Sequence, residues 1–230
     1  MSDTLSLAPG LALLFDMDGV IVDSNPLHRE AWEIFNRRYG LETTEAMHES
    51  MYGKRNDDIV RGFYGADLPH DEVIARGAAK EALYREMAGT RLEQMLVPGL
   101  RDFLEEYRNA PMGLASNGEP ANVELILENA GLRRYFQAVV DGHQVVNPKP
   151  DPEIYLKVAE ILQVAPENCI VFEDSSAGVQ AGLSAGMRVV GLCTTHGYLP
   201  GTTITVHNFC SGELRQWLAS ERVESSLRSQ

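Results

Sequence analysis

Two carboxylates, Asp16 and Asp18, directly follow a short apolar run near the start of the 230-residue chain. The run, residues 11–15, is too short to cross a membrane and has the length of a buried strand. Acids at the end of a buried strand are electrostatically costly unless a cation neutralises them or one of them keeps its proton. The pair therefore indicates either a metal-assisted site or, more simply, a solvated turn, and by itself it does not decide between them.

The charge balance excludes some classes of partner. The chain has 33 acidic and 20 basic residues, a net charge of −13. Nucleic acids and anionic membranes are bound by a surplus of Lys and Arg, so neither is expected as a partner. A small phosphorylated ligand needs only a few local cations and remains compatible with this composition.

Cysteine usage and the N-terminal residues indicate a reducing compartment. Cys169, Cys193 and Cys210 are odd in number, widely spaced and without a C-x-x-C pair, which argues against a disulfide framework and against a zinc site. Residues 1–10 lack a basic region and a long apolar core, so no signal peptide is expected. No segment is long and apolar enough to span a bilayer. We therefore expect a cytoplasmic protein.

The hydrophobic pattern divides the chain into two parts. Residues 26–92 place apolar residues at spacings of three and four among charged ones, which indicates helices, and they show no strand pattern. From residue 98, helical patterns alternate with strand-like segments, which predicts βαβ units and a parallel sheet covered on both faces. The strand-like segments after the first are residues 112–118, 136–140, 169–172, 188–192 and 203–206. A last helix is expected over residues 212–218, followed by a frayed polar tail.

The predicted architecture is a Rossmann-like, doubly wound α/β core with an inserted all-helical cap domain. Residues 1–24 and 93–230 form the core, and residues 25–92 form the insert. Because both connections of the insert sit beside the acidic pair, it is placed to act as a lid over that site.

Polar side chains end several of the predicted strands. Ser116 and Asn117 follow one strand, Glu173 and Asp174 another, and Lys149 lies in a proline-rich loop. In a doubly wound sheet the carboxyl ends of the strands converge on one crevice. Carboxylates with one lysine and one hydroxyl suit a hard cation and an oxyanion, which favours Mg²⁺, and the His and Cys ligands that zinc prefers are missing.

Four segments, in this order, resemble the motifs of a known family. They are FDMDGV at residues 15–20, LASN at 114–117, KPDP at 149–152 and FEDSSAG at 172–178. Their order and spacing, over essentially the whole chain, resemble the haloacid dehalogenase superfamily, in its branch of helical-cap phosphatases and β-phosphoglucomutases.

The resemblance implies a role for each site residue. Asp16 would be the nucleophile that forms an aspartyl-phosphate, and Asp18 the general acid and then the base. Ser116 and Asn117 would bind phosphoryl oxygens, and Lys149 would offset the charge of the phosphate and of the nucleophile. Taken singly, Ser116 reads as a helix cap and Lys149 as a surface residue; their joint occurrence favours function.

The resemblance also implies a metal site. Asp16, Asp174 and the backbone carbonyl of Asp18 would hold Mg²⁺, with Glu173 as a further candidate ligand. The alternative for the pair Glu173 and Asp174 is negative charge at a helix N-terminus, where it stabilises the helix dipole.

The insert carries the candidate substrate residues. The loop from Gly53 to Asp58 resembles the Gly-x-Arg cap loop of sugar- and polyol-phosphate phosphatases, with Arg55 above the crevice. Its alternative is a basic surface turn. His28 and Lys80 align with cap residues of β-phosphoglucomutases, although a lone histidine can equally be structural.

Two comparisons with related enzymes help to distinguish the possible activities. Related dehalogenases generally lack the second aspartate, so Asp18 argues against dehalogenation. Mutases of this type carry an arginine where this chain has Asn56 and a serine where it has Gly118, which argues for a phosphatase. We therefore predict a Mg²⁺-dependent phosphatase of a small phosphorylated metabolite, of the sugar or polyol phosphate class. The alternatives are a β-phosphoglucomutase-like mutase and a non-catalytic binder of phosphorylated ligands. The resemblance implies a monomer or a homodimer.

Overall fold

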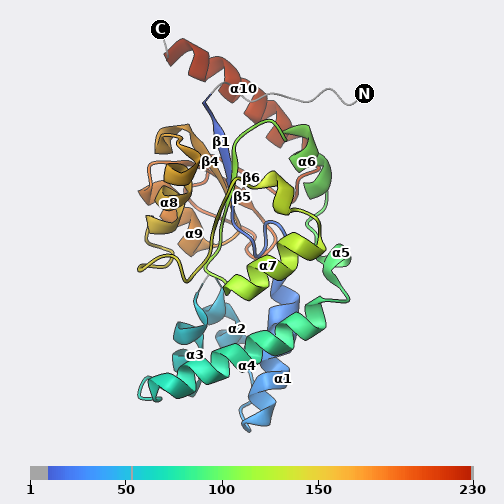
Figure 1. Cartoon of the computed structure of the whole chain (residues 1–230), viewed down its shortest axis with the longest axis vertical. Coiled ribbons are helices and arrows are strands. Elements are labelled where there is room, and N and C mark those ends of the chain that lie inside the picture. Colours follow the sequence, from blue (N-terminus) through green and yellow to red (C-terminus); the bar gives the residue numbers. More distant parts are fainter. Residues whose placement is uncertain (1–9, 53, 229–230) are drawn as a thin grey trace.

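The sheet is formed by six parallel strands in the order β3-β2-β1-β4-β5-β6, with the first strand in the middle (Figure 1). This computed structural model describes residues 10–52 and 54–228. The strands are β1 (Ala12–Phe15), β2 (Met112–Ala115), β3 (Ala138–Val140), β4 (Cys169–Glu173), β5 (Arg188–Leu192) and β6 (Ile204–Val206). The reversal of strand order at β1 confirms the Rossmann-like fold class.

Alternate side chains of β1 enter two different cores. Leu13 and Phe15 pack on one face of the sheet and Ala12 and Leu14 on the other. Both faces are covered, so the strand is a continuous apolar run rather than an alternating one. On the first face lie α6 (Leu100–Glu106), α7 (Pro120–Asn129) and α10 (Gly212–Arg228); on the second lie α8 (Glu153–Leu162) and α9 (Ser176–Ser184).

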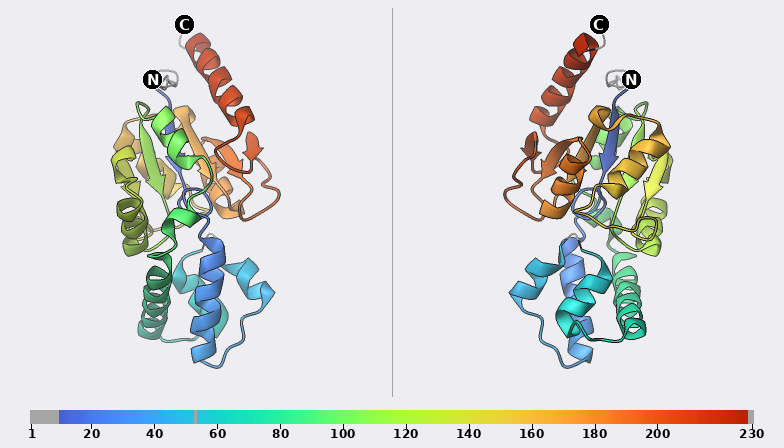
Figure 2. Two further views of the ribbon diagram at one scale, coloured as in Figure 1. Left: turned by 90° about the vertical axis from the view of Figure 1, so that its right-hand side faces the viewer. Right: turned by 90° about the vertical axis from the view of Figure 1, so that its left-hand side faces the viewer.

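Four helices form a separate bundle beyond the carboxyl ends of the strands (Figures 1 and 2). They are α1 (Asn25–Arg38), α2 (Glu45–Met51), α3 (Asn56–Tyr64) and α4 (His70–Ala88), and we call them the helical insert. They share an apolar cluster of their own, built around Trp32, Phe35 and Val60. All four lie within the predicted insert, while the division of the chain into domains at residues 24 and 93 stays a prediction.

The chain enters and leaves the helical insert through two adjacent segments. Val22 and Leu96 form an antiparallel bridge. Asp23 N donates to Met95 O at 2.7 Å, and Val97 N donates to Ile21 O at 3.1 Å. The short helix α5 (Leu92–Met95) leads into this return segment. The two connections are therefore held side by side, a few residues after the acidic pair.

The last helix differs from the prediction. We expected a helix over residues 212–218 and then a frayed tail, but α10 continues to Arg228. Glu221 is buried and pairs with Arg188 of β5, so helix formation beyond Leu218 is supported by a contact that the polar sequence of the tail does not reveal. The described part of the chain does not include residues 1–9, Gly53 or residues 229–230. The expectations about a leader, about the insert loop and about the tail fall partly on these residues.

In the part of the chain that the structure describes, none of the helices combines the length and the apolar character needed to cross a membrane.

The aromatic packing around β1 predicts a large effect of Phe15→Ala. The Phe15 ring is fully buried, stacks on Phe172 with 4.8 Å between ring centroids, and meets Phe136 edge-on. Removing a buried phenyl ring leaves a cavity, so we expect a loss of about 3–5 kcal/mol in the free energy of unfolding, measured by urea denaturation. The control Ile161→Ala removes a side chain that is 49% exposed and is expected to cost less than about 0.5 kcal/mol. If both variants lost the same free energy of unfolding, the aromatic cluster around Phe15 would not be the stabilising core of the sheet.

Candidate active site

Polar residues from several strand ends meet in one cavity between the sheet and the helical insert. The cavity measures about 560 Å³. The core contributes Asp16 and Asp18 after β1, Ser116 and Asn117 after β2, Lys149 before α8, and Asp174 after β4. The insert contributes Arg55, His28 and Lys80. The structure thus brings together the residues that the sequence singled out.

Lys149 forms the centre of a buried ion network. Its Nζ lies 2.6 Å from Asp16 Oδ1 and 2.6 Å from Glu173 Oε1, and it also donates to the carbonyl of Ala115 and contacts the hydroxyl of Tyr155, both at 3.0 Å. Burial alone would lower the pKa of Lys149, but the charges of Asp16 and Glu173 raise it above its ordinary value. These neighbours therefore favour the charged ammonium form, which is held beside Asp16.

Three carboxylates lie close enough to share one cation. Oxygens of Asp16, Glu173 and Asp174 lie within 4.8 Å of one another, and all three residues are buried. Burial, together with the charges of Glu173 and Asp18, raises the pKa of Asp16 to about 8 against the opposing effect of Lys149. Burial and the charges of Glu173 and Asp16 raise the pKa of Asp174 well above 3.8. A donor set of this kind fits a hard divalent cation, which would favour the ionised forms.

Backbone geometry leaves room for these acids. Gly19 has a φ of +78°, and a Cβ at that position would lie 1.8 Å from Oδ2 of Asp174. A side chain at residue 19 would therefore displace the carboxylate as well as strain the turn. The glycine of the first motif is explained by this close approach.

Glu173 serves as an anchor within the cluster. Its Oε1 accepts from Lys149 and, at 2.8 Å, from the hydroxyl of Tyr155. Its Oε2 accepts from the backbone N–H groups of Asp174 and Ser175 and from the Ser175 hydroxyl. Both oxygens are thus fully engaged by the protein.

The loop after β2 offers polar groups to the cavity. The Ser116 side chain is buried, and its Oγ accepts from the backbone N–H of Gly118 at 3.0 Å. The side-chain oxygen of Asn117 accepts from the backbone N–H of Lys149 at 3.3 Å. These contacts hold the loop after β2 against the loop that carries Lys149.

Asp18 has a different environment from Asp16. The Ser24 hydroxyl donates to its Oδ1, and His28 Nε2 lies 3.6 Å from the same oxygen. Burial would raise the pKa of Asp18, but the interactions with His28 and the hydrogen bond from Ser24 outweigh it and lower the pKa. The surroundings of Asp18 therefore favour its ionised form, whereas burial among other acids raises the pKa of Asp16 against the effect of Lys149.

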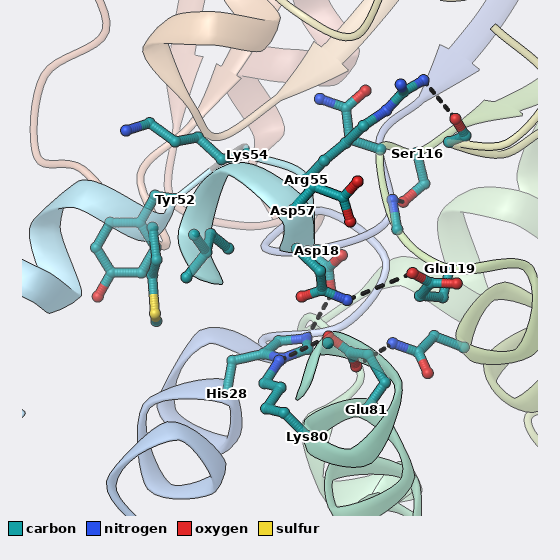
Figure 3. Close-up of a pocket in the computed structure, with 18 of the residues that line it drawn as sticks. Asp18, His28, Tyr52, Lys54, Arg55, Asp57, Lys80, Glu81, Ser116 and Glu119 are labelled. Atoms are coloured by element: carbon teal, nitrogen blue, oxygen red, sulfur yellow. Dashed lines mark hydrogen bonds and ion pairs between the residues drawn. The ribbon is translucent and has the colours of Figure 1, made fainter. Parts of the chain in front are cut away.

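The insert reaches Asp18 through a short chain of contacts. His28 Nδ1 lies 2.8 Å from Lys80 Nζ, so Lys80 contacts His28 on the side away from Asp18 (Figure 3). The His28 ring also stacks on Tyr84 with 3.8 Å between ring centroids. The two residues expected to bind substrate are thus connected to the second aspartate.

Arg55 connects the helical insert to the core. Its guanidinium donates to the backbone carbonyls of Gly142 and of Val145, the latter at 2.7 Å, and points away from Asp18 (Figure 3). Beside it, Asn56 Nδ2 lies 3.5 Å from Glu119 Oε1 of the core. Gly53, the first residue of the predicted cap loop, lies outside the described residues.

Several residues of the site could not be recognised, or were not recognised, from the sequence. No local pattern marks Ser24 as a site residue, and its sequence position suggests only a hinge or cap residue, yet its hydroxyl donates to Asp18. Thr195 follows β5 and donates to Asp174, so the rule that strand ends carry the site would have found it. Tyr155 and Glu81 look like ordinary helix residues until the fold places them beside Glu173 and Asn122.

The chain matches the haloacid dehalogenase-like hydrolase family over residues 11–186, and it belongs to that family. It is 35% identical over 188 residues to a phosphorylated carbohydrates phosphatase of Thermotoga maritima, covering 79% of this chain and 84% of the relative. It is 33% identical over 179 residues to a fructose-1-phosphate phosphatase of Escherichia coli, covering 77% and 94%. Its structure is similar to that of a β-phosphoglucomutase from Clostridium difficile, with a TM-score of 0.81, 28% identity and coverage of 92% and 98%.

These relationships confirm the predicted family and the fold. Together, the hydrolase family and the two phosphatase relatives identify the chain as an enzyme of the phosphatase type.

The acidic cluster predicts that a divalent cation stabilises the protein in a pH-dependent way. The pKa of Asp16 rises from 3.8 to about 8 on folding, so without a cation stability falls as the pH rises through that interval. A cation that binds the ionised cluster reverses this loss. We therefore expect Mg²⁺ to raise the melting temperature more at the upper end of this pH interval than at the lower end. At a Mg²⁺ concentration one hundred times its Kd, the gain in the free energy of unfolding is expected to be about 2.7 kcal/mol.

The measurement is thermal unfolding with and without Mg²⁺ across this range of pH. Asp174→Ala removes one carboxylate and is expected to lose most of the effect. Stabilisation of equal size at every pH, or in both proteins, would contradict a cation site at the cluster.

Proposed function

We propose that the protein is a Mg²⁺-dependent phosphatase that hydrolyses a small phosphorylated metabolite, of the sugar or polyol phosphate class, through an aspartyl-phosphate on Asp16. The observation that carries this proposal is the separation of the two aspartates. Asp16 is paired with Lys149, and Asp18 is held apart by Ser24 and His28, at the edge of the same cavity. Two acids held in such different surroundings are suited to two different roles.

In the first step, an oxygen of Asp16 attacks phosphorus and the bond from phosphorus to the ester oxygen breaks. Asp18 gives its proton to that leaving oxygen. Asp18 is ionised in the free protein, but the negative charge of a bound phosphoryl group favours its protonated form. Lys149 balances the charge on Asp16 and on the phosphoryl oxygens, and Ser116 and Asn117 hydrogen-bond to those oxygens.

In the second step, Asp18 takes a proton from water, and the resulting hydroxide attacks phosphorus. The acyl-phosphate bond breaks, inorganic phosphate leaves, and Asp16 is restored. The proton is then back on Asp18, so the cycle balances without a further reactant.

The acidic cluster supports a metal ion in this mechanism. Asp16, Asp174 and the backbone carbonyl of Asp18 would hold Mg²⁺, which neutralises charge on the phosphoryl oxygens. Glu173 remains a further candidate, but both of its oxygens already accept hydrogen bonds from the protein, so we assign it chiefly to holding Lys149.

The substrate class is supported by the relatives and by the cavity. The two phosphatase relatives act, by name, on phosphorylated carbohydrates and on fructose 1-phosphate. A volume of about 560 Å³ accommodates a ligand of that size. We propose that residues 25–92 act as a cap domain above residues 1–24 and 93–230, that Arg55 holds this cap closed, and that the enzyme works in the cytoplasm as a monomer or homodimer.

A phosphosugar mutase is the second candidate. The similarity to the β-phosphoglucomutase structure and the contact of Lys80 with His28 favour it. Against it, the Arg55 guanidinium is bound to core carbonyls rather than open to a second phosphate. A non-catalytic binder of phosphorylated ligands would have no use for the separate proton-transfer environment of Asp18.

Phosphate release from a panel of sugar and polyol phosphates tests the phosphatase. We expect release with Mg²⁺, none with EDTA, and loss on the order of 10⁴-fold or more in Asp16→Asn, which removes the nucleophile. Circular dichroism and thermal unfolding establish that the variant is folded. Full activity of Asp16→Asn would show that the nucleophile is another residue, and no release from any phosphate ester would refute the proposed function.

The conversion of β-glucose 1-phosphate to glucose 6-phosphate, with a sugar bisphosphate as primer, tests the mutase. Because Arg55 is engaged by the core, we expect phosphate release to exceed isomerisation. The two products are separated enzymatically in the same reaction. Isomerisation faster than hydrolysis would make the mutase the main activity.

A further inference from the structure

A buried cation–anion pair lies where α4 of the helical insert meets the core. Lys80 is 1% exposed and Glu81 is 4% exposed. Lys80 Nζ lies 2.7 Å from Glu81 Oε1 and 2.8 Å from His28 Nδ1. Burying an ammonium group is costly unless anionic or polar partners surround it, so Glu81 is what allows Lys80 to sit charged against His28.

The second oxygen of Glu81 is satisfied from the other side of the junction. Asn122 of α7, in the core, donates its Nδ2 to Glu81 Oε2 at 2.6 Å. The side-chain oxygen of Asn122 in turn accepts from Arg85 of α4 at 2.9 Å. Asn122 is itself buried. The amide is thus held by α4 through both of its ends, and Figure 3 shows Glu81 and Lys80 side by side below Asp18.

These contacts form a continuous chain from the core to the second aspartate. It runs from Asn122 through Glu81, Lys80 and His28 to Asp18. Burial would raise the pKa of Glu81, but Lys80, His28 and the hydrogen bond from Asn122 lower it to about 2. Glu81 is therefore an anion at every pH at which the enzyme would work.

The geometry fixes the imidazole at three points. Lys80 contacts Nδ1, the Tyr84 ring stacks on its face with the planes 5° apart, and Nε2 is left toward Asp18. Without Asn122, one oxygen of Glu81 would be buried and unpaired, which costs about 1–3 kcal/mol. Glu81 would then turn toward water and draw Lys80 away from the imidazole. The alignment at Asp18 thus depends on a residue of the core.

We propose that Glu81 and Asn122 are positioning residues for the acid–base group Asp18, and that they complete its alignment only when α4 is seated against α7. This inference rests on the proposed function and deepens it. Neither residue touches the reacting atoms. They connect the proton transfer to the arrangement in which α4 of the helical insert is seated against α7 of the core.

The test compares two leaving groups. p-Nitrophenolate departs without a proton, whereas a sugar alkoxide needs one from Asp18. The value of kcat/KM reports only the steps through departure of the leaving group, so it isolates the acid role. In Glu81→Gln and Asn122→Ala we expect kcat/KM for the best sugar phosphate to fall about tenfold or more, and that for p-nitrophenyl phosphate to fall less than about threefold.

Glu81→Gln keeps the shape of the side chain and leaves the hydrogen bond between Arg85 and Asn122 in place. The two oxygens of Glu81 accept hydrogen bonds from Lys80 and from Asn122. The amide of a glutamine has only one oxygen, so its NH₂ group would face one of these two donors and that hydrogen bond would be lost. The double variant is expected to lose no more than the worse single variant, because both residues act through one chain. The control Glu72→Gln makes the same change on the exposed side of α4, where Glu72 pairs with Arg76. It is expected to leave kcat/KM for both substrates unchanged.

Folded variants that lose activity equally on both substrates, or whose losses multiply in the double variant, would overturn the positioning role. The positioning role would also be overturned if Glu81→Gln and Asn122→Ala hydrolysed both substrates with the same kcat/KM as the wild-type protein. A wild-type protein that hydrolyses neither substrate would instead refute the phosphatase itself, so the two failures are distinguishable.

Discussion

One buried ammonium group holds the candidate active site together. Lys149 lies between Asp16 at the end of β1 and Glu173 at the end of β4, at 2.6 Å from each. The pairing of β1 with β4, with Phe15 opposite Phe172, brings these two acids to the same level of the sheet. Without the lysine, two carboxylates would be buried side by side with Asp174 close by, an arrangement that the fold would have to offset in another way.

The same constraint explains why the two aspartates differ. Asp16 is surrounded by acids of the core and pairs with Lys149, whereas Asp18 contacts Ser24 and His28 of the helical insert. The core therefore determines the charge around Asp16, and Ser24 and the helical insert determine the environment of Asp18. In the proposed mechanism, the nucleophile and the proton-transfer group would thus be controlled by two different parts of the chain.

Much of this could be predicted from the sequence, because it depends on local pattern. Apolar runs of strand length and their alternation with helical periods predict the sheet, and the polar residues at the strand ends predict Asp16, Ser116 and Asp174 at one edge. Contacts between distant segments could not be predicted. Nothing local distinguishes Glu81 from the other acids of α4, or Asn122 from a surface amide. The extension of α10 depends likewise on an ion pair with β5.

The paired connections of the helical insert have a consequence for how such an enzyme diversifies. Because Val22 and Leu96 are bridged, the core is closed on itself whether the segment between them is long or short. Lengthening a closed loop costs little, about 0.6 kcal/mol for each doubling. The length and sequence of the insert can therefore change, and with them the residues that face the cavity, while Asp16 after β1 and Lys149 in the loop before α8 keep their places.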